Sequence, residues 1–157
     1  MYKRALVPLD GSIVAESIIP FILEIAGPLN VDVALLRVVV PLPPTVVDAG
    51  PVVIGDIKEL RAEAEEYLVP FATELRANGV RATTEVRCGE PVAEILGAVQ
   101  ETKADLIIMT THGRTGFGRL LFGSVAEGVL RRADVPVFLM RQTEAQVAAR
   151  TVWQPLR

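Results

Sequence analysis

The residues with the clearest chemical potential form the segment 111–124, whose sequence is THGRTGFGRLLFGS. It follows the apolar run 106–109 and precedes a helical pattern at 125–130. Glycines let backbone N–H groups approach an anion closely, and a helix N-terminus adds unpaired donors and the positive end of its dipole. A strand, a glycine-rich loop and a helix in this order therefore predict a site for phosphate.

The spacing within this segment differs from two common phosphate motifs. No Gly-Lys-Ser/Thr closes it, as in a P-loop, and a dinucleotide fingerprint would follow the first strand instead. Arg114 and Arg119 add positive charge, and Ser124 offers a hydroxyl and a backbone N–H at the start of the helix. The alternative is a glycine-rich turn with incidental arginines. The spacing alone favours a phosphate-bearing ligand, with a nucleotide as the leading candidate.

Three single residues have more than one interpretation. Asp10 follows the first apolar run, where its carboxylate can accept from a ribose hydroxyl or an adenine amine, help to hold a metal, or cap a turn. His112 is the only histidine, and no nucleophile, base and orienting group can be assembled around it. Cys88 is the only cysteine, so zinc chemistry and an intramolecular disulfide are disfavoured. Any metal would be Mg²⁺ or Mn²⁺ carried by ligand phosphates.

Composition narrows the class of protein. The length of 157 residues predicts one domain with a substantial core. A net charge of −3 and scattered aromatic residues argue against nucleic-acid binding. No run of about 18 residues lacks a charge or a proline, and no secretory signal is evident, so we expect a cytoplasmic protein without a membrane span.

Short apolar runs alternate with helical patterns along the chain. The runs predict strands at 5–7, 33–40, 80–88, 105–109 and 135–140, and the helical patterns lie at 12–26, 57–75, from 91 onward, and 125–132. Pro20 is expected to kink the first helix and Gly27-Pro28 to end it. Residues 41–56 hold four prolines and predict a long loop.

Two strands have the pattern of sheet edges. Residues 80–88 alternate apolar and polar side chains, and Pro136 interrupts 135–140. A doubly wound α/β domain with one five-stranded parallel sheet in the order 3-2-1-4-5, and helices on both faces, places both at edges. Ligands bind where chain direction reverses, here between the first and fourth strands. Segments 8–12 and 109–124 are expected to meet there.

With these features the chain resembles the universal stress protein family, specifically its nucleotide-binding branch. The family signature is Gly-x2-Gly-x9-Gly-Ser/Thr after the fourth strand. Gly113, Gly123 and Ser124 match its last three elements, whereas Thr110 occupies the position of its first glycine. Segments 7–12, 35–38, 89–91 and 135–141 are also similar to family patterns. The resemblance covers 2–141, so we expect a domain at 1–141 and a tail at 142–157.

The resemblance implies a nucleotide site and a homodimer. Adenine would lie near Val38 and the turn at Pro8, Leu9 and Asp10, and ribose near Met109 and Thr110. Phosphates would lie on Gly113, Gly123, Ser124 and Val125. The loop residues His112 and Arg114 are further candidates from the sequence itself. The homodimer would form through the last strand, Val135 to Met140.

Three functions compete on this basis. The first is an ATP- or ADP-binding regulatory module in which occupancy alters the dimer surface or the loop 41–56. The second is a slow ATPase in which Asp10 or His112 positions water. The third is a dimerisation partner in which the Thr110 side chain blocks the pocket and no nucleotide binds. An electron-transfer flavoprotein is a further possibility by fold analogy only.

Overall fold

The computed structural model describes residues 1–41, 55–112 and 123–150. Most of the predicted loop 41–56, together with Gly113 and Arg114, lies outside them. The elements, in chain order, are β1 Arg4–Pro8, α1 Ile13–Glu16, α2 Ile18–Leu29, β2 Asp32–Val39, α3 Gly55–Ala77, β3 Ala82–Cys88, α4 Pro91–Thr102, β4 Leu106–His112, α5 Ser124–Arg132, β5 Val137–Gln142 and α6 Glu144–Arg150.

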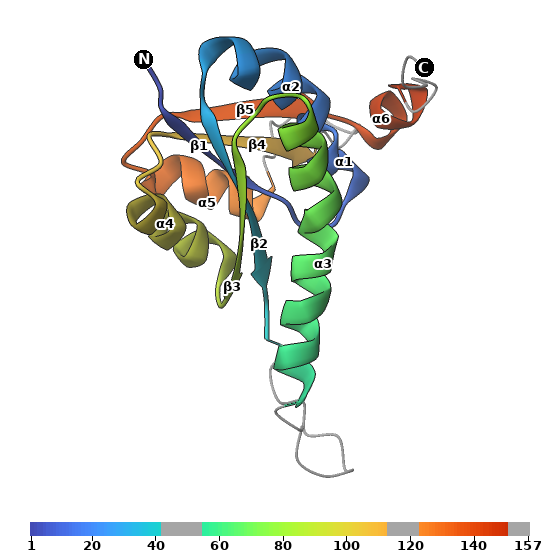
Figure 1. Ribbon diagram of the computed structural model, residues 1–157. Coiled ribbons are helices and arrows are strands. Elements are labelled where there is room, and N and C mark those ends of the chain that lie inside the picture. The colour runs from blue at the N-terminus through green and yellow to red at the C-terminus, as the bar shows by residue number, and fades with distance from the viewer. Residues whose placement is uncertain (42–54, 113–122, 151–157) are drawn as a thin grey trace.

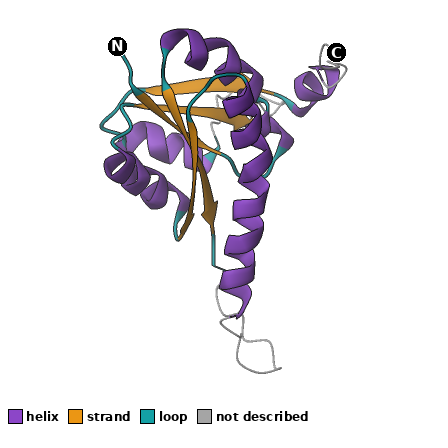
Figure 2. Ribbon diagram, in the orientation of Figure 1, coloured by secondary structure: helices purple, strands orange, loops and turns teal. Residues whose placement is uncertain are grey.

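The five strands form one parallel sheet in the order β3-β2-β1-β4-β5, which confirms the predicted topology. Helices α1, α2 and α3 lie on one face, and α4 and α5 lie on the other (Figure 1). Figure 2 shows the same layers by secondary structure, with the strands between two sets of helices. β1 and β4 lead to helices on opposite faces of the sheet. The chain therefore leaves the carboxyl ends of these two neighbouring strands in opposite directions, at the predicted switch point.

Each face of the sheet has its own apolar core. Side chains alternate along the strands, so Leu35 packs with α2 and α3, whereas its neighbour Leu36 packs with α4 and α5. Both side chains are fully buried. Burial on both faces explains why 33–39 is almost continuously apolar in sequence.

The first crossover differs from the prediction of one kinked helix over 12–26. The helix is interrupted at Ser17, whose hydroxyl donates to the Val14 carbonyl at 2.6 Å, and α2 starts at Ile18. Pro20 lies in the first turn of α2, four residues after Glu16, the last residue of α1, so the helix is broken one turn before the proline instead of being bent at it.

The end of α2 also differs from the prediction. Gly27-Pro28 does not stop the helix, because Pro28 gives up one bond close to the helix end and the chain continues to Leu29. The terminating residue is Asn30, in the left-handed conformation at φ 54°. Its backbone N–H donates to Gly27, and the Val31 N–H donates to Ala26, which satisfies carbonyls of the last turn.

The last two strands are displaced along the chain from their predicted bounds. β4 extends to His112 rather than ending at Met109, so Thr110 and Thr111 belong to a strand and not to the loop. β5 runs to Gln142, and Pro136 precedes it instead of interrupting it. The Pro136 carbonyl still accepts from the Ile107 N–H at 2.9 Å. β5 is nevertheless the edge strand that was predicted.

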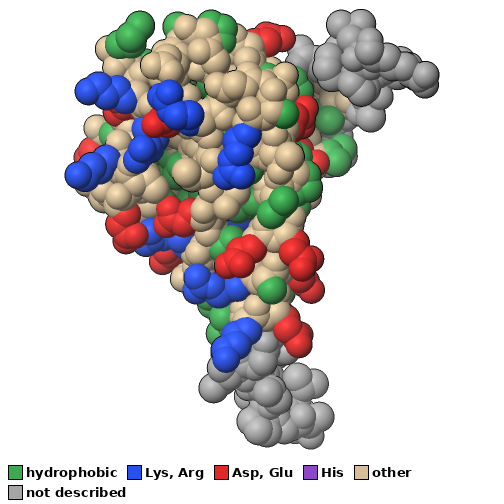
Figure 3. Space-filling view, in the orientation of Figure 1, with side chains coloured by type: hydrophobic (Ala, Val, Ile, Leu, Met, Phe, Trp, Pro, Cys, Tyr) green, Lys and Arg blue, Asp and Glu red, His purple; other side chains and the backbone are tan. Residues whose placement is uncertain are grey.

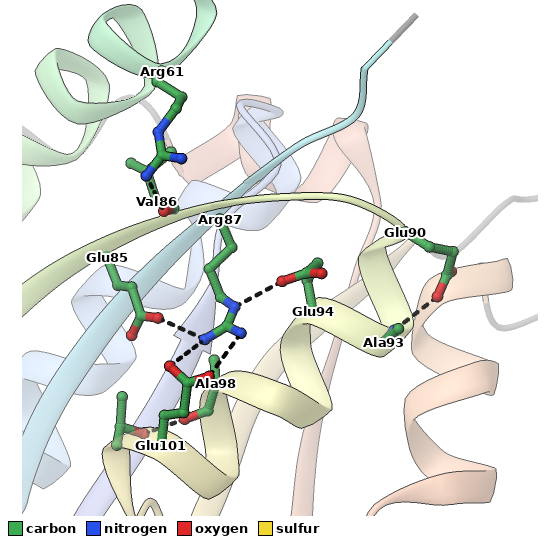
Figure 4. A network of polar contacts seen from close by, with 10 residues as sticks. Arg61, Glu85, Val86, Arg87, Glu90, Ala93, Glu94, Ala98 and Glu101 are labelled. Atoms are coloured by element: carbon green, nitrogen blue, oxygen red, sulfur yellow. Dashed lines mark hydrogen bonds and ion pairs between the residues drawn. The ribbon is translucent and has the colours of Figure 1, made fainter. Parts of the chain in front are cut away.

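The polar side of β3 is less exposed than its sequence suggested. Thr83 lies in water, but Arg87 folds against α4, where its side chain is only 18% exposed. Its guanidinium donates to Glu94 at 2.8 Å and also to Glu85 and Glu101 (Figure 4). The polar side chains at this end of β3 therefore form an ion-pair network that joins β3 to α4, and they are not fully exposed to water.

Acidic side chains line the solvent side of α3, as Figure 3 shows. Across the described parts of the chain, no helix is long and apolar enough to cross a membrane. Gln142, the first residue of the predicted tail, is buried as the last residue of β5, and α6 follows it.

Candidate functional site

A cavity of about 800 Å³ opens at the carboxyl ends of β1, β2 and β4. It extends onto both faces of the sheet. Its walls come from the β1–α1 turn, the end of β2, one side of α3, the start of α4, the end of β4 and the N-terminus of α5. The lining residues are Pro8, Leu9, Asp10, Ala15, Leu36, Arg37, Val38, Val39, Val40, Leu60, Glu63, Ala64, Tyr67, Pro91, Ile95, Met109, Thr110, Thr111, Gly123, Ser124, Val125 and Ala126.

The N-terminus of α5 forms one end of this cavity. Gly123 is the N-cap, and the first helical bond runs from the Glu127 N–H to the Gly123 carbonyl at 2.9 Å. The N–H groups of Ser124, Val125 and Ala126 precede that bond and have no intrahelical acceptor. Because glycine offers no side-chain cap either, no group in the described residues pairs with these donors, and they suit an anion.

Thr111 provides a further polar group in the wall of the cavity. Its side chain is 4% exposed, and its hydroxyl has no hydrogen-bond partner in the part of the chain that the structure describes. A buried hydroxyl without a partner costs about 1–3 kcal/mol. The group therefore fits an oxygen-rich ligand that restores the missing bond.

The turn after β1 is held by its own side chains. Asp10 accepts from the Ser12 N–H at 2.9 Å, and the Ser12 hydroxyl accepts from the Ala15 N–H at 3.1 Å. The Leu9 N–H donates to the Leu36 carbonyl at 2.8 Å, which fixes the turn to β2. Asp10 therefore has the turn role foreseen as an alternative, while it also lines the cavity.

The α3 side of the cavity contains residues that the sequence analysis did not single out. Arg37 lies 5.4 Å from the ring centre of Tyr67 and donates to the Leu9 carbonyl at 3.3 Å. The Tyr67 hydroxyl donates to Glu16 of α1 at 3.0 Å. Burial, and then the bond to Glu16, raise the pKa of the Tyr67 phenol well above its usual range. Arg37 could have been noticed in the sequence, because it is the charged residue inside the otherwise apolar run 33–40.

The structure brings most of the predicted site residues to this one cavity. Those that line it are Pro8, Leu9, Asp10, Val38, Met109, Thr110, Gly123, Ser124 and Val125. The backbone of His112 pairs with Gln142 at the end of β4, and Gly113 and Arg114 lie outside the described residues. Within the described ranges, no group of three or more His, Cys, Asp or Glu side chains is arranged to hold a metal ion.

The model of the universal stress protein family matches residues 1–141. The chain belongs to this family. Universal stress protein MJ0531 of Methanocaldococcus jannaschii is 32% identical over 151 residues, which cover 93% of this chain and 86% of the relative. The resemblance inferred from the glycine series and the β1 turn is thereby confirmed.

Solved structures of family members share the fold. That of MJ0577 from the same organism superimposes with a TM-score of 0.69 at 26% identity, and covers 90% of this chain and 97% of the other. A universal stress protein from Archaeoglobus fulgidus, solved in complex with dAMP, has a TM-score of 0.62 at 25% identity, with 88% and 97% covered. The second protein thus carries a purine nucleotide.

Proposed function

We propose that the chain binds an adenine nucleotide, ATP or ADP, in the cavity and acts as a nucleotide-dependent regulatory module. One observation carries the proposal: the N–H groups that begin α5, which have no acceptor among the described residues, lie in the wall of the same cavity as Thr111, whose buried hydroxyl has no partner there either. Both need acceptor oxygens, which phosphates and ribose provide. The dAMP complex of the Archaeoglobus fulgidus relative supports a purine nucleotide as the source of those oxygens.

The proposed placement is the one that the family resemblance implies, and the walls of the cavity support it. The base lies beside Val38 and the turn at Pro8, where the lining is mainly apolar, and the ribose lies near Met109 and Thr110. The phosphates lie at Gly123–Val125, at the positive end of α5. A divalent cation would be held mainly by the phosphates, with Asp10 as a carboxylate in the same cavity.

We propose a homodimer as the regulated state. β5 forms an edge of the sheet, and Phe138 on it is 39% exposed, so a second copy can pair there and cover it. α5 connects the phosphate end of the cavity to β5. Sedimentation equilibrium with and without ATP tests this part: a monomer under both conditions contradicts it.

Nucleotide binding is tested on the purified protein. Denaturation followed by chromatography identifies any carried nucleotide, and calorimetric titration of the emptied protein with ATP and ADP gives the affinities. We expect binding with a dissociation constant below a millimolar. No carried nucleotide, together with no binding at millimolar ATP, contradicts the proposal.

A glycine substitution tests the position of the phosphates. A Cβ at Gly123 meets no atom of the described residues within 4 Å, and its φ of −56° and ψ of 152° suit a branched residue. Gly123→Val should therefore fold, while its side chain occupies the proposed phosphate position and weakens ATP binding by at least about tenfold. Gly27→Ala, whose nearest contact is Val80 at 3.9 Å, is the control and should leave the affinity unchanged. Equal affinities would place the phosphates elsewhere.

A further inference from the structure

The cavity has two lobes on opposite faces of the sheet. One lobe contains the N-terminus of α5. The other is lined by α3, whose residues Leu60, Glu63, Ala64 and Tyr67 recur at helical spacing and face it together with Arg37. A volume of about 800 Å³ lies towards the upper end of the roughly 300–1,000 Å³ typical of small-molecule sites. The α3 lobe is therefore open to a part of the ligand that the α5 lobe does not hold.

Arg37 is the only Lys or Arg among the described residues that line the cavity. Among the described residues its guanidinium has one hydrogen bond, to the Leu9 carbonyl, and contacts the face of Tyr67. Within the ranges that the structure describes, no carboxylate lies within ion-pair distance of it. A half-buried guanidinium has five N–H donors, so most of its hydrogen-bonding capacity is available to a ligand.

The position of this cation is set in advance by its neighbours. Tyr67 is anchored by its bond to Glu16 and by an edge contact with Phe71, whose ring centre lies 5.3 Å away. The guanidinium rests on that ring. A Cβ on Gly11 would lie 3.2 Å from its Nη2, so glycine at this position leaves room for it. A pre-positioned donor fork of this kind suits phosphate or carboxylate.

The negative charges in the same wall do not neutralise Arg37. Asp10 and Glu63 line the cavity, but both residues are exposed to water, which screens their fields, whereas Arg37 is half-buried. Asp10 also accepts a hydrogen bond from Ser12. An anion that reaches Arg37 thus meets an unpaired cation in partly desolvated surroundings.

We propose that Arg37 forms a second anion subsite, and that the chain prefers a nucleotide with a phosphate on its ribose in addition to the 5′-phosphate. The proposal rests on the nucleotide site described above. The two positive features lie on opposite faces of the sheet, one against α3 and one at the start of α5. One phosphate does not contact both. A second phosphate at the 2′ or 3′ position leaves the ribose in a different direction from the 5′ chain, and among the described lining residues Arg37 is the cation available to hold it.

The test compares AMP with adenosine 3′,5′-bisphosphate and adenosine 2′,5′-bisphosphate by calorimetric titration. We expect at least one bisphosphate to bind about tenfold more tightly than AMP, as one charge-assisted hydrogen-bonding pair provides. Arg37→Met should remove that advantage and leave the affinity for AMP within about twofold. Arg61→Met is the matched control, because Arg61 is exposed, does not line the cavity and, among the described residues, hydrogen-bonds only to the Val86 carbonyl.

The outcomes separate this inference from the proposed function. If neither AMP nor ATP binds, the nucleotide site itself is wrong. If AMP binds but neither bisphosphate binds more tightly, or if the advantage persists in Arg37→Met, only the second subsite is wrong. The same conclusion holds if Arg37→Met weakens ATP relative to AMP, because the 5′ phosphate chain would then reach Arg37. Thermal unfolding of each variant verifies that it is folded.

Discussion

Arg37 and Arg87 lie on the neighbouring strands β2 and β3, and their surroundings are opposite. Arg87 is enclosed by Glu85, Glu94 and Glu101, with nitrogen–oxygen distances of 2.8–3.0 Å (Figure 4). Arg37 has no such partner in the described residues and lines the cavity. Arg87, which is paired with carboxylates of the protein itself, holds β3 and α4 together. A cation without such carboxylates is available to a ligand.

Each of the two arginines also faces a glycine. A Cβ on Gly97 of α4 would lie 3.2 Å from Nη2 of Arg87, and a Cβ on Gly11 would lie at the same distance from Nη2 of Arg37. The glycines differ in backbone, because Gly11 has a φ of +86° and Gly97 lies inside a helix. Glycine thus leaves room for a guanidinium in a turn at Gly11 and in a helix at Gly97. Substituting each glycine allows the two arginines to be compared.

The largest expected difference is in stability. Arg87→Met leaves Glu85 and Glu94, which are 29% and 25% exposed, without their cation, and should lower the free energy of unfolding by about 2–3 kcal/mol. Arg37→Met breaks no ion pair in the described residues and should cost under about 1 kcal/mol, mainly from the contact with Tyr67. Urea denaturation measures both. Equal losses would mean that Arg37 is also a structural cation.

Gly11→Ala should have the next largest effect. A side chain at positive φ costs about 1–2 kcal/mol, and the new methyl group meets the guanidinium of Arg37. Because Arg37 is not held by carboxylates, it can move, so the backbone strain should account for most of the loss. We expect the variant to lose the preference for a bisphosphate as well. A stability loss with that preference intact would separate the turn from the anion subsite.

Gly97→Ala tests whether Arg87 is fixed in place. Alanine in a helix interior is favoured over glycine by about 1 kcal/mol, but the methyl group must displace a guanidinium held by three carboxylates. The two effects should nearly cancel in the wild-type background. In the Arg87→Met background the gain of about 1 kcal/mol should appear. Urea denaturation of the four proteins measures this coupling, and additivity would contradict it.

The contrast between these arginines also indicates what the sequence could predict. The strand order follows from apolar runs and edge patterns. Strands buried on both faces are continuously apolar in sequence, and strands with one exposed face alternate apolar and polar residues. That Asp10 and Ser124 line the same cavity follows from the strand order, because ligands bind where the chain direction reverses. Both predictions needed only local periodicity and general rules of chain connection.

The roles of Arg37 and Arg87 could not be predicted in the same way. Their surroundings depend on which helix covers each face and on side-chain positions far apart in sequence, such as Tyr67 for Arg37 and Glu101 for Arg87. Helix and strand ends were misplaced for a related reason. Whether Pro28 ends a helix or Pro136 interrupts a strand depends on the hydrogen bonds of neighbouring segments.

The smallest expected effect is in the pH dependence of stability. Hydrogen bonds from Arg87 lower the pKa of the Glu101 carboxyl below its ordinary value. A depressed pKa in the folded state stabilises the fold above the unfolded pKa, about 4.3, and this contribution is lost as pH falls through the lower folded value. In Arg87→Met the pKa of Glu101 returns towards normal, so stability should fall less steeply between about pH 5 and 3.

Arg37→Met provides the control for this last effect. The Asp105 carboxyl also has a lowered pKa, because the backbone N–H groups of Arg4 and Lys3 outweigh the opposing effect of burial. The pKa of Glu90 is lowered by the N–H groups at the start of α4. Neither shift depends on either arginine, so their contributions cancel between variants. Urea denaturation at pH 7, 5, 4 and 3 should therefore give Arg37→Met the wild-type acid slope and Arg87→Met a shallower one. The opposite assignment would mean that Arg87 does not lower the pKa of the Glu101 carboxyl.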